Sequence, residues 1–481
     1  MVNSFTGSHR TATGADILSD SEKNRLLKKK LLVLLGAGSS VGQDFPSTSE
    51  LDKEVAGWAA EWSTRKPPDP IDSMDQRTRT NFYDRLWANR LDYCAGLTEE
   101  QRSIVARRTR PNYERVLGDL HALMNGVLPK PFGDPILKWI PRADVFRQVG
   151  IAPETDQLDQ HGSNKVFHAV RGQLQALSDR LAERIRGRSN LFDLELSNGH
   201  GTAAFAPYRE LMGGLAREFD IGVYNLNYDS VALHALPDSF VGFDRRSGDF
   251  QAAEVLSRKD WGFLYHLHGS IHHWIKDGSH TMEDDNFGPK IIWQDDLSLQ
   301  GEDWQDSLYL TTQSDEKRVL LTSLIAGGWK LDQLQEEPFL TLYSCLPRHA
   351  HEANAILIGG YGFGDSHINS ILRNALRAKA NRGKRPPVLV LDFNPGRQPF
   401  AHRVDAWSLA LRTALRVPTQ SFRIPAQRSE RHYTRLPAKL PPRAFERSNR
   451  APVAIWNGGF TAASKELAKI VAWLDGDESA L

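Results

Sequence analysis

Four short glycine-rich or polar motifs hold the residue types most suited to chemistry in this chain. They are GAGSS at residues 36–40, NLNYD at 225–229, HLHG at 266–269 and GGYGFGD at 359–365. Glycine turns admit a diphosphate closely, because no side chain stands between it and the backbone. A histidine is best placed to take a proton near neutral pH, and an amide can hold a water or a ribose hydroxyl. The four motifs together therefore indicate a nucleotide site.

The polar members of this set suit one kind of reaction. Asn227 and Asp229 are two residues apart on an expected strand, so they point the same way, and Gly269 leaves room beside the ring of His268. Such a set suits attack at a sugar carbon with departure of a neutral base. The transition state is oxocarbenium-like, so positioning and electrostatics matter more than a strong nucleophile. Singly, each of these polar side chains can also serve to satisfy buried backbone groups.

Each motif follows or ends an apolar run that is typical of a buried strand. The expected strands lie within residues 31–40, 221–233, 261–274, 355–365 and 386–396, with a last one at PVAIW near residue 455. In an open parallel sheet the carboxyl ends of the strands gather at one edge, so the motifs are expected to surround one pocket. A helix is expected after the first glycine turn, with its free N–H groups facing an anion such as a pyrophosphate.

The pattern predicts an α/β fold with a doubly wound, mainly parallel, Rossmann-like sheet and a large helical insertion. We expect a catalytic domain at residues 30–59 and 205–400, interrupted by the insertion at 60–204. A polar segment at 1–29 precedes it, and a basic segment with a closing strand and helix follows at 401–481. Helices are expected at 51–59 (with Ser49 as the cap), 113–124, 167–186, 208–219, 318–335, 368–380 and 463–474.

Composition narrows the class of protein. The net charge of +1 gives no case for nucleic-acid binding. The two cysteines, Cys94 and Cys345, are too few for a four-thiolate zinc site and indicate a reducing compartment. The first residues lack the apolar core of a signal peptide, and no apolar run approaches ~18 residues, so we expect a cytoplasmic protein without a membrane span. Histidines 266, 268, 272 and 273 have no carboxylate or thiolate partner at a recognisable spacing, so no metal is expected.

The chain resembles sirtuin-like proteins, in the bacterial branch found in anti-phage defence systems. The resemblance rests on GAGSS with Pro46 nearby, residues 227–229, His268-Gly269 and GGYGFGDSHIN at 359–369. It implies NAD as the substrate, Asn227 and His268 as the catalytic pair, and Asp229 near the nicotinamide amide. It also implies a wider NAD site: Gly36, Ala37, Gly38, Ser39 and Ser40 at the diphosphate, Gly360, Tyr361, Gly362 and Phe363 near the adenosine half, Asn394 at the nucleotide, and Pro46 and Asp365.

The departures from the sirtuin pattern bear on the reaction. Leu226 stands where sirtuins have a glutamine, Pro46 leads into Ser47-Thr48-Ser49 instead of the phenylalanine and arginine of deacylases, and the four zinc cysteines are missing. The peptide cleft of deacylases lies against the zinc module, so these departures argue against deacylation. The defence branch resembles enzymes that hydrolyse NAD to nicotinamide and ADP-ribose.

We therefore predict an NAD hydrolase that depletes NAD in anti-phage defence by abortive infection. Two alternatives remain open: an NAD-dependent protein deacylase, and a non-catalytic NAD or ADP-ribose sensor or scaffold for a partner ATPase. A hydride-transfer dehydrogenase is disfavoured, because GAGSS lacks the third glycine at GxGxxG spacing.

A homo-oligomer is also expected. The acidic segment 277–306 and the basic segment 401–450 are opposite in charge and suited to meet between subunits. Resemblance adds a possible separately encoded partner, a HerA-type ring ATPase or a short Argonaute.

Overall fold

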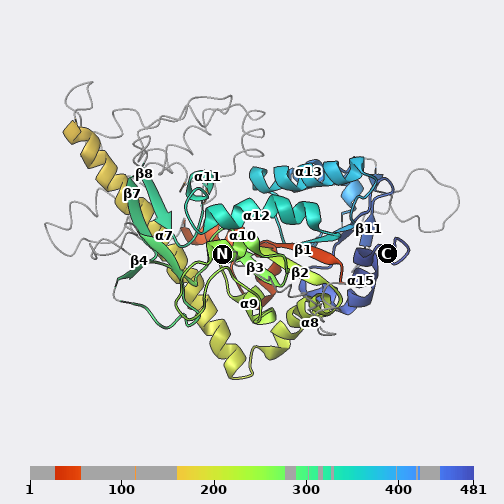
Figure 1. The fold of residues 1–481 in the computed structure, drawn as a ribbon, viewed down its shortest axis with the longest axis horizontal. Coiled ribbons are helices and arrows are strands. Elements are labelled where there is room, and N and C mark those ends of the chain that lie inside the picture. Colours follow the sequence, from red (N-terminus) through yellow and green to blue (C-terminus); the bar gives the residue numbers. More distant parts are fainter. Residues whose placement is uncertain are drawn as a thin grey trace, which may run out of the picture.

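A seven-stranded sheet forms the centre of the molecule in a computed structural model (Figure 1). The structure describes residues 28–55, 114, 117, 160–276, 289–301, 303–311, 318–326, 330–396, 398–418, 421–422 and 445–481. The strand order is β11-β12-β10-β9-β1-β2-β3, and every neighbouring pair is parallel except β11 with β12. The strands are β1 Lys30–Leu35, β2 Asp220–Asn225, β3 Phe263–His266, β9 Ala355–Gly359, β10 Val388–Leu391, β11 Phe445–Arg447 and β12 Val453–Trp456.

The six parallel strands run in the order of a doubly wound fold. Taken as β3-β2-β1-β9-β10-β12, they have the sequence order 3-2-1-4-5-6. In such a sheet the connections leave the two central strands, here β1 and β9, toward opposite sides, which opens a crevice at their carboxyl ends. The predicted α/β fold class is therefore confirmed.

The central strand β1 is buried on both faces. Leu31, Val33 and Leu35 belong to one core cluster, and Leu32 and Leu34 to the other. The first cluster is closed by α8 (Thr202–Glu218) and α15 (Leu467–Asp475), the second by α12 (Phe339–Glu352) and α13 (Ser366–Asn381), and Figure 1 shows the two pairs on opposite sides of the sheet. This two-sided burial explains why the strand reads as a continuous apolar run.

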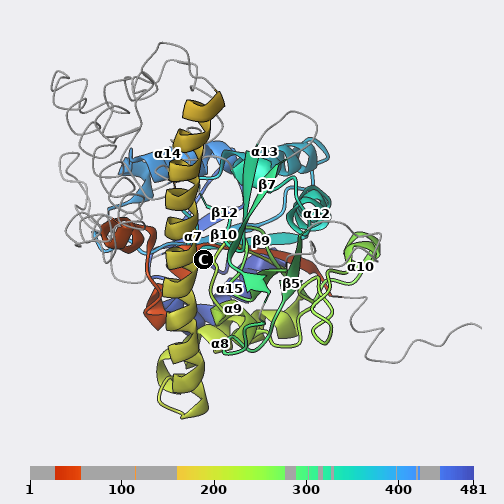
Figure 2. The same cartoon turned by 90° about the vertical axis from the view of Figure 1, so that its left-hand side faces the viewer.

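Smaller elements complete the described part of the chain. Figure 2 shows the long helix α7 (Gln160–Ser197) along one side of the molecule. A small antiparallel sheet, β5-β4-β6, contains β4 His273–Lys276, β5 Lys290–Trp293 and β6 Trp304–Gln305, and β7 Ser307–Thr311 pairs with β8 Arg318–Thr322. The shorter helices are η1 Ala37–Ser39, η2 Val41–Gln43, α9 Val231–Ala235, α10 Ala252–Ser257, α11 Lys330–Gln333, η4 Phe400–His402, α14 Ala406–Ala414 and η6 Thr461–Glu466.

Several expected elements differ from the observed ones at their ends. The expected strand at 221–233 stops at Asn225, and residues 231–235 form α9, because the Asp229 carboxylate accepts a hydrogen bond from the Val231 N–H and turns the chain. The run at 261–274 divides between β3 and β4, which belong to different sheets, with Gly269 in a left-handed turn between them. Residues 318–322 form β8 instead of a helix, because they pair with β7.

The expected helix directly after GAGSS is replaced by the two short 3-10 turns η1 and η2. A regular helix begins only at residue 48. Its cap is Ser47 rather than Ser49: Glu50 reaches back and accepts hydrogen bonds from the Ser47 N–H and hydroxyl, both at 2.7 Å. The bond from the Ser47 N–H to the Glu50 carboxylate is one of the two that make up a capping box.

The sheet also extends beyond residue 400, because β12 and β11 continue it past β10. The expected helix at 167–186 is part of the longer α7. That at 113–124 falls outside the described residues apart from 114 and 117, which are both helical. Among the described residues, no helix has both the length and the apolar character needed to cross a membrane.

Truncating the central strand is expected to destabilise the protein strongly. Leu34→Ala removes a side chain that is 2% exposed in the core beneath α12 and α13, so the free energy of unfolding should fall by ~2–5 kcal/mol. Urea unfolding monitored by circular dichroism measures this change. Leu256→Ala, at a leucine that is 50% exposed, is the control and should stay within about 0.5 kcal/mol of the parent protein.

Candidate functional site

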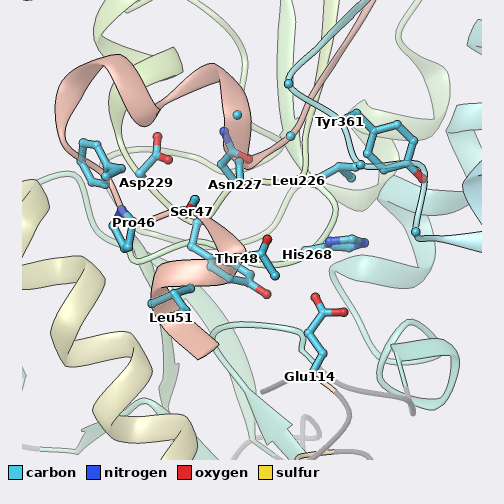
Figure 3. Close-up of a pocket in the computed structure, with 18 of the residues that line it drawn as sticks. Pro46, Ser47, Thr48, Leu51, Glu114, Leu226, Asn227, Asp229, His268 and Tyr361 are labelled. Carbon is cyan, nitrogen blue, oxygen red and sulfur yellow. The ribbon is translucent and has the colours of Figure 1, made fainter. Parts of the chain in front are cut away.

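A cavity of about 540 Å³ opens at the carboxyl ends of β1 and β9, where the doubly wound order reverses (Figure 3). Residues from all four sequence motifs line it. Those predicted as site residues are Gly36, Ala37, Gly38, Pro46, Asn227, Asp229, His268, Gly360, Tyr361, Gly362 and Asp365. The sheet therefore brings together segments that are more than 300 residues apart in the sequence.

Two glycine turns meet at the base of the cavity. The N–H of Gly36 donates to the Gly359 carbonyl at 2.9 Å, and the N–H of Gly38 donates to the Gly360 carbonyl at 3.0 Å. A Cβ on Gly36 would lie 2.7 Å from the Tyr361 Cα, and a Cβ on Gly360, where φ is +62°, would lie 2.1 Å from the Ser39 nitrogen. These glycines are thus required by the contact between the two turns as well as by any ligand.

Gly362 and Gly364 are glycines of a different kind. Both line the cavity, and a Cβ at either position would meet no atom within 4 Å. Packing does not exclude a side chain there. The two positions leave the wall of the cavity open to a ligand that approaches the backbone.

Asn227 is held by the serines of the first glycine turn. Its Nδ2 donates to the hydroxyls of Ser39 and Ser40, each at 3.0 Å, and its backbone N–H donates to Asn225 Oδ1 at 3.1 Å. With the amide nitrogen committed in this way, the buried Oδ1 has no hydrogen-bond partner. Leaving a buried acceptor unpaired costs about 1–3 kcal/mol, so this oxygen is suited to a ligand hydroxyl or a water.

Asp229 lies beside this group and also lines the cavity. Burial raises its pKa to about 6, and hydrogen bonds from the Ser40 hydroxyl and the Val231 N–H limit the rise. Ser40 is thus shared between the Asn227 amide and the Asp229 carboxylate. The serine pair of GAGSS orients the polar side chains of the site without itself lining the cavity.

His268 is the buried imidazole of the site. Its Nε2 is 3.8 Å from Asp365 Oδ1 and has no hydrogen-bond partner. Burial and, to a smaller extent, the positive charge of Lys330 lower the pKa of His268 to about 3, against the opposing effect of Asp365. The ring is therefore neutral at physiological pH, with a proton on one of its nitrogens and the other available as an acceptor.

Two charged residues that line the cavity were not predicted from the sequence. The Lys330 ammonium, on the first residue of α11, lies 2.9 Å from both Asp365 Oδ1 and Glu114 Oε1. Glu114 belongs to the expected insertion (Figure 3). Neither stands in a glycine-rich or polar strand-end motif, so no local signal in the sequence marks them.

Four predicted residues do not line the cavity. Ser39 and Ser40 act through Asn227, as described above. Phe363 is buried, with φ of +54°, and packs against Tyr361 and Trp407. Asn394 lies in the turn after β10, where its Nδ2 donates to the Gln398 carbonyl at 2.7 Å. The predicted Asp365 does line the cavity, beside His268.

The histidine-rich stretch divides into two environments. His266, His272 and His273 surround Trp293, with ring centroids between 4.8 and 5.9 Å from it. His268 instead faces Asp365 and His367, and the ligand atoms of these three residues lie within 4.8 Å of one another. Lys330 already pairs with the Asp365 carboxylate, so we interpret this group as an ion-pair network rather than a metal site. The absence of a metal stays a prediction.

Comparison with known proteins agrees with this arrangement. Residues 222–410 match the sequence model of a SIR2-like domain. This part of the chain is sirtuin-like. The matched region contains Asn227, His268 and Asp365, whereas the first glycine turn precedes it. None of the curated proteins matches the chain.

Two solved structures, each of a Sir2 homologue with a bound nucleotide, resemble the chain distantly. A Sir2 homologue–NAD complex has 12% identity and a TM-score of 0.31, with 94% of each chain covered. A mutant Sir2 homologue in complex with ADP-ribose has 10% identity and a TM-score of 0.27, covering 79% of this chain and 87% of the other.

Substitution at the turn contact should separate two classes of glycine. Gly360→Ala places a Cβ against the Ser39 backbone at a left-handed position, so the free energy of unfolding should fall by at least ~2 kcal/mol. Gly362→Ala, where the Cβ meets open space, is the control and should change it by less than about 1 kcal/mol. Equal losses in thermal or urea unfolding would contradict this assignment.

The buried histidines should make the fold sensitive to acid. Burial lowers the pKa of His273 in the folded protein well below its ordinary value of about 6.5. Between the lowered pKa and pH 6.5, the unfolded chain therefore binds a proton that the folded chain does not. Stability is therefore lost as pH falls below about 6.5. His273→Phe, among Phe243, Trp293 and Phe339, should reduce the loss between pH 7 and pH 5 by about 2 kcal/mol.

Urea unfolding at the two pH values measures this difference. His200→Gln, at an exposed histidine of the loop between α7 and α8, is the control and should keep the acid sensitivity of the parent protein. An unchanged pH dependence in His273→Phe would show that this ring is not charged on unfolding.

Proposed function

We propose that this protein hydrolyses the nicotinamide–ribose bond of NAD and releases nicotinamide and ADP-ribose. The observation that carries the proposal is the unpartnered Oδ1 of Asn227 in the same cavity as the neutral ring of His268. Attack by water at a sugar carbon requires two groups. One is a hydrogen-bond acceptor that positions the hydroxyl, and the other is a neutral base that takes its proton. The SIR2-like match over residues 222–410 supports the same chemistry.

The shape of the cavity suits a dinucleotide. It lies at the switch point of a doubly wound sheet, where such ligands bind, and its volume of about 540 Å³ falls within the ~300–1,000 Å³ typical of small-molecule pockets. The glycine turn at residues 36–38 offers backbone to the diphosphate. Gly362 and Gly364 leave space beside it for the rest of the nucleotide.

The reaction can be written from these residues. Asn227 Oδ1 accepts a hydrogen bond from the attacking water or a ribose hydroxyl and so orients it. The water oxygen bonds to the ribose C1′ while the C1′–N bond breaks. The electron pair of the broken bond stays with the nicotinamide nitrogen and neutralises the ring. The proton lost from the water passes to His268. Because the sugar gains positive charge as the base departs, the carboxylate of Asp229 beside the site favours the transition state.

The finer assignments stay proposals of the same kind. Resemblance supports Asp229 near the nicotinamide amide, residues 360–363 near the adenosine half, Asn394 at the nucleotide, and NAD depletion in anti-phage defence. A homo-oligomer, a separately encoded ATPase or Argonaute partner and a cytoplasmic location are likewise predictions from the sequence.

Removing either central group should abolish most of the activity. In Asn227→Ala and His268→Ala, the rate of nicotinamide release from NAD should fall by ~10²–10⁴-fold, because each variant loses one of the two groups that orient and deprotonate the nucleophile. Chromatographic measurement of nicotinamide, with circular dichroism to confirm folding, tests this. Asn198→Ala and His200→Ala, at exposed positions between α7 and α8, are the controls and should keep the parent rate.

The same assay separates the alternatives. Nicotinamide release that requires an acyl-lysine peptide would identify a deacylase, and NAD binding without release would identify a sensor or scaffold. Release at the parent rate by folded Asn227→Ala or His268→Ala would overturn the assignment of these residues.

A further inference from the structure

We propose that Asp365 and Lys330 are positioning residues for His268: the Asp365 carboxylate, held by Lys330, fixes the imidazole with its proton on Nε2 and leaves Nδ1 as the acceptor. The proposal deepens the function proposed above and rests on the role given there to His268. Asp365 faces the imidazole and Lys330 holds Asp365, so the proposed action of the pair is through the ring.

The geometry places one oxygen between two nitrogens. Asp365 Oδ1 is 2.9 Å from Lys330 Nζ and 3.8 Å from His268 Nε2. Asp365 is the N-cap residue of α13, so its backbone is held at the start of a sixteen-residue helix. The Nε2 atom is buried and has no hydrogen-bond partner, because 3.8 Å is too long for a hydrogen bond. The Asp365 carboxylate is the acceptor proposed for a proton on Nε2, since catalytic hydrogen bonds are often long without substrate and shorten when it binds.

Lys330 determines which group holds the proton taken during the reaction. Its side chain is 10% exposed and bridges the carboxylates of Asp365 and Glu114. Burial alone would raise the pKa of Asp365, but His268 and Lys330 together lower it to about 2. A carboxylate held ionised in this way does not compete for the proton, which stays on the imidazole and is stabilised there.

The charge balance of the group suits a cationic transition state. With His268 neutral, Lys330 carries one positive charge against the two carboxylates of Asp365 and Glu114. The surplus negative charge lies beside the cavity in which the sugar becomes oxocarbenium-like. A lysine paired to only one acid would leave no such surplus.

The other titratable groups facing this cluster are uncharged near neutral pH. The His367 ring, on α13, lies 6.3 Å from the His268 ring, and burial lowers its pKa. Burial also raises the pKa values of Tyr343, on α12, and of Tyr361, beside Asp365. Among the described residues, Lys330 and Asp365 are therefore the charged groups that act on His268 most directly.

The test is a titration of His268 by ¹⁵N NMR, with its signal assigned by comparison with His268→Gln. In the parent protein the ring should stay neutral, with the proton on Nε2, to the lowest pH at which the fold persists. In Lys330→Met the Asp365 carboxylate faces the imidazole without a competing cation, so the pKa of His268 should rise by at least about one unit. In Asp365→Asn the single tautomer should be lost.

Activity provides a second readout. As pH is lowered, the rate of nicotinamide release by Lys330→Met should begin to fall at a higher pH than in the parent protein, because protonated His268 cannot act as a base. Asp365→Asn should lower kcat by ~10-fold or more while KM changes by less than about threefold, since the carboxylate orients the ring rather than the substrate. Lys330→Arg should resemble the parent protein.

The controls keep the test open to failure. Lys290→Met breaks the exposed pair with Asp249 and should change neither the titration nor the rate. If Lys330→Met does not fold, the double variant Lys330→Met/Glu114→Gln removes one charge of each sign and should show the same shift. An unchanged His268 pKa and tautomer in the lysine and aspartate variants would overturn the proposal. Because the titration needs no substrate, its outcome is independent of whether the protein hydrolyses NAD.

Discussion

The close contact between the two glycine turns is the constraint on which the site depends. Hydrogen bonds of 2.9 and 3.0 Å join the turn after β1 to the turn after β9, and a side chain on Gly36 or Gly360 would collide with the opposite backbone. From one turn, Ser39 and Ser40 hold Asn227; from the other, the chain runs on to Asp365, which faces His268. A single backbone contact thus sets the positions of both halves of the site.

Burial gives the polar residues of the site their chemical character. The same low-dielectric surroundings raise the pKa of Asp229 toward neutrality and lower that of His268 away from it, because burial disfavours the charged form of each group. Asp365 stays ionised in these surroundings because the ammonium group of Lys330, 2.9 Å away, offsets the cost of its burial. The result is one neutral base and one unpaired amide oxygen in a cavity whose carboxylates outnumber its single lysine.

Local sequence patterns predicted the strands of the central sheet but did not predict all of the segments that connect them. The runs ending in GAGSS, NLNYD, HLHG and GGYGFGD contain buried strands whose ends line one cavity, as predicted, because two-sided burial and glycine turns leave a local signature. Residues 318–322 were misjudged as helix because their strand partner, β7, is a tertiary neighbour that periodicity does not reveal. Asn394 was grouped with the site by resemblance, yet its side chain binds its own turn.

The sequence by itself determined the fold class and the edge of the sheet where the cavity lies, since strand ends and glycine turns are encoded within a few residues. Eleven of the residues that line the cavity were predicted from the four motifs and the family resemblance. Only the tertiary structure decided that Lys330 and Glu114 join Asp365 beside His268, that Ser39 and Ser40 orient Asn227, and that Gly36 packs on the turn at Gly360. The physical reason is that ion pairs and side-chain hydrogen bonds between distant segments depend on distances that the fold creates. The residues around Lys330, in a four-residue helix, do not indicate its ion-pair partners, which come within 3 Å only in the folded structure.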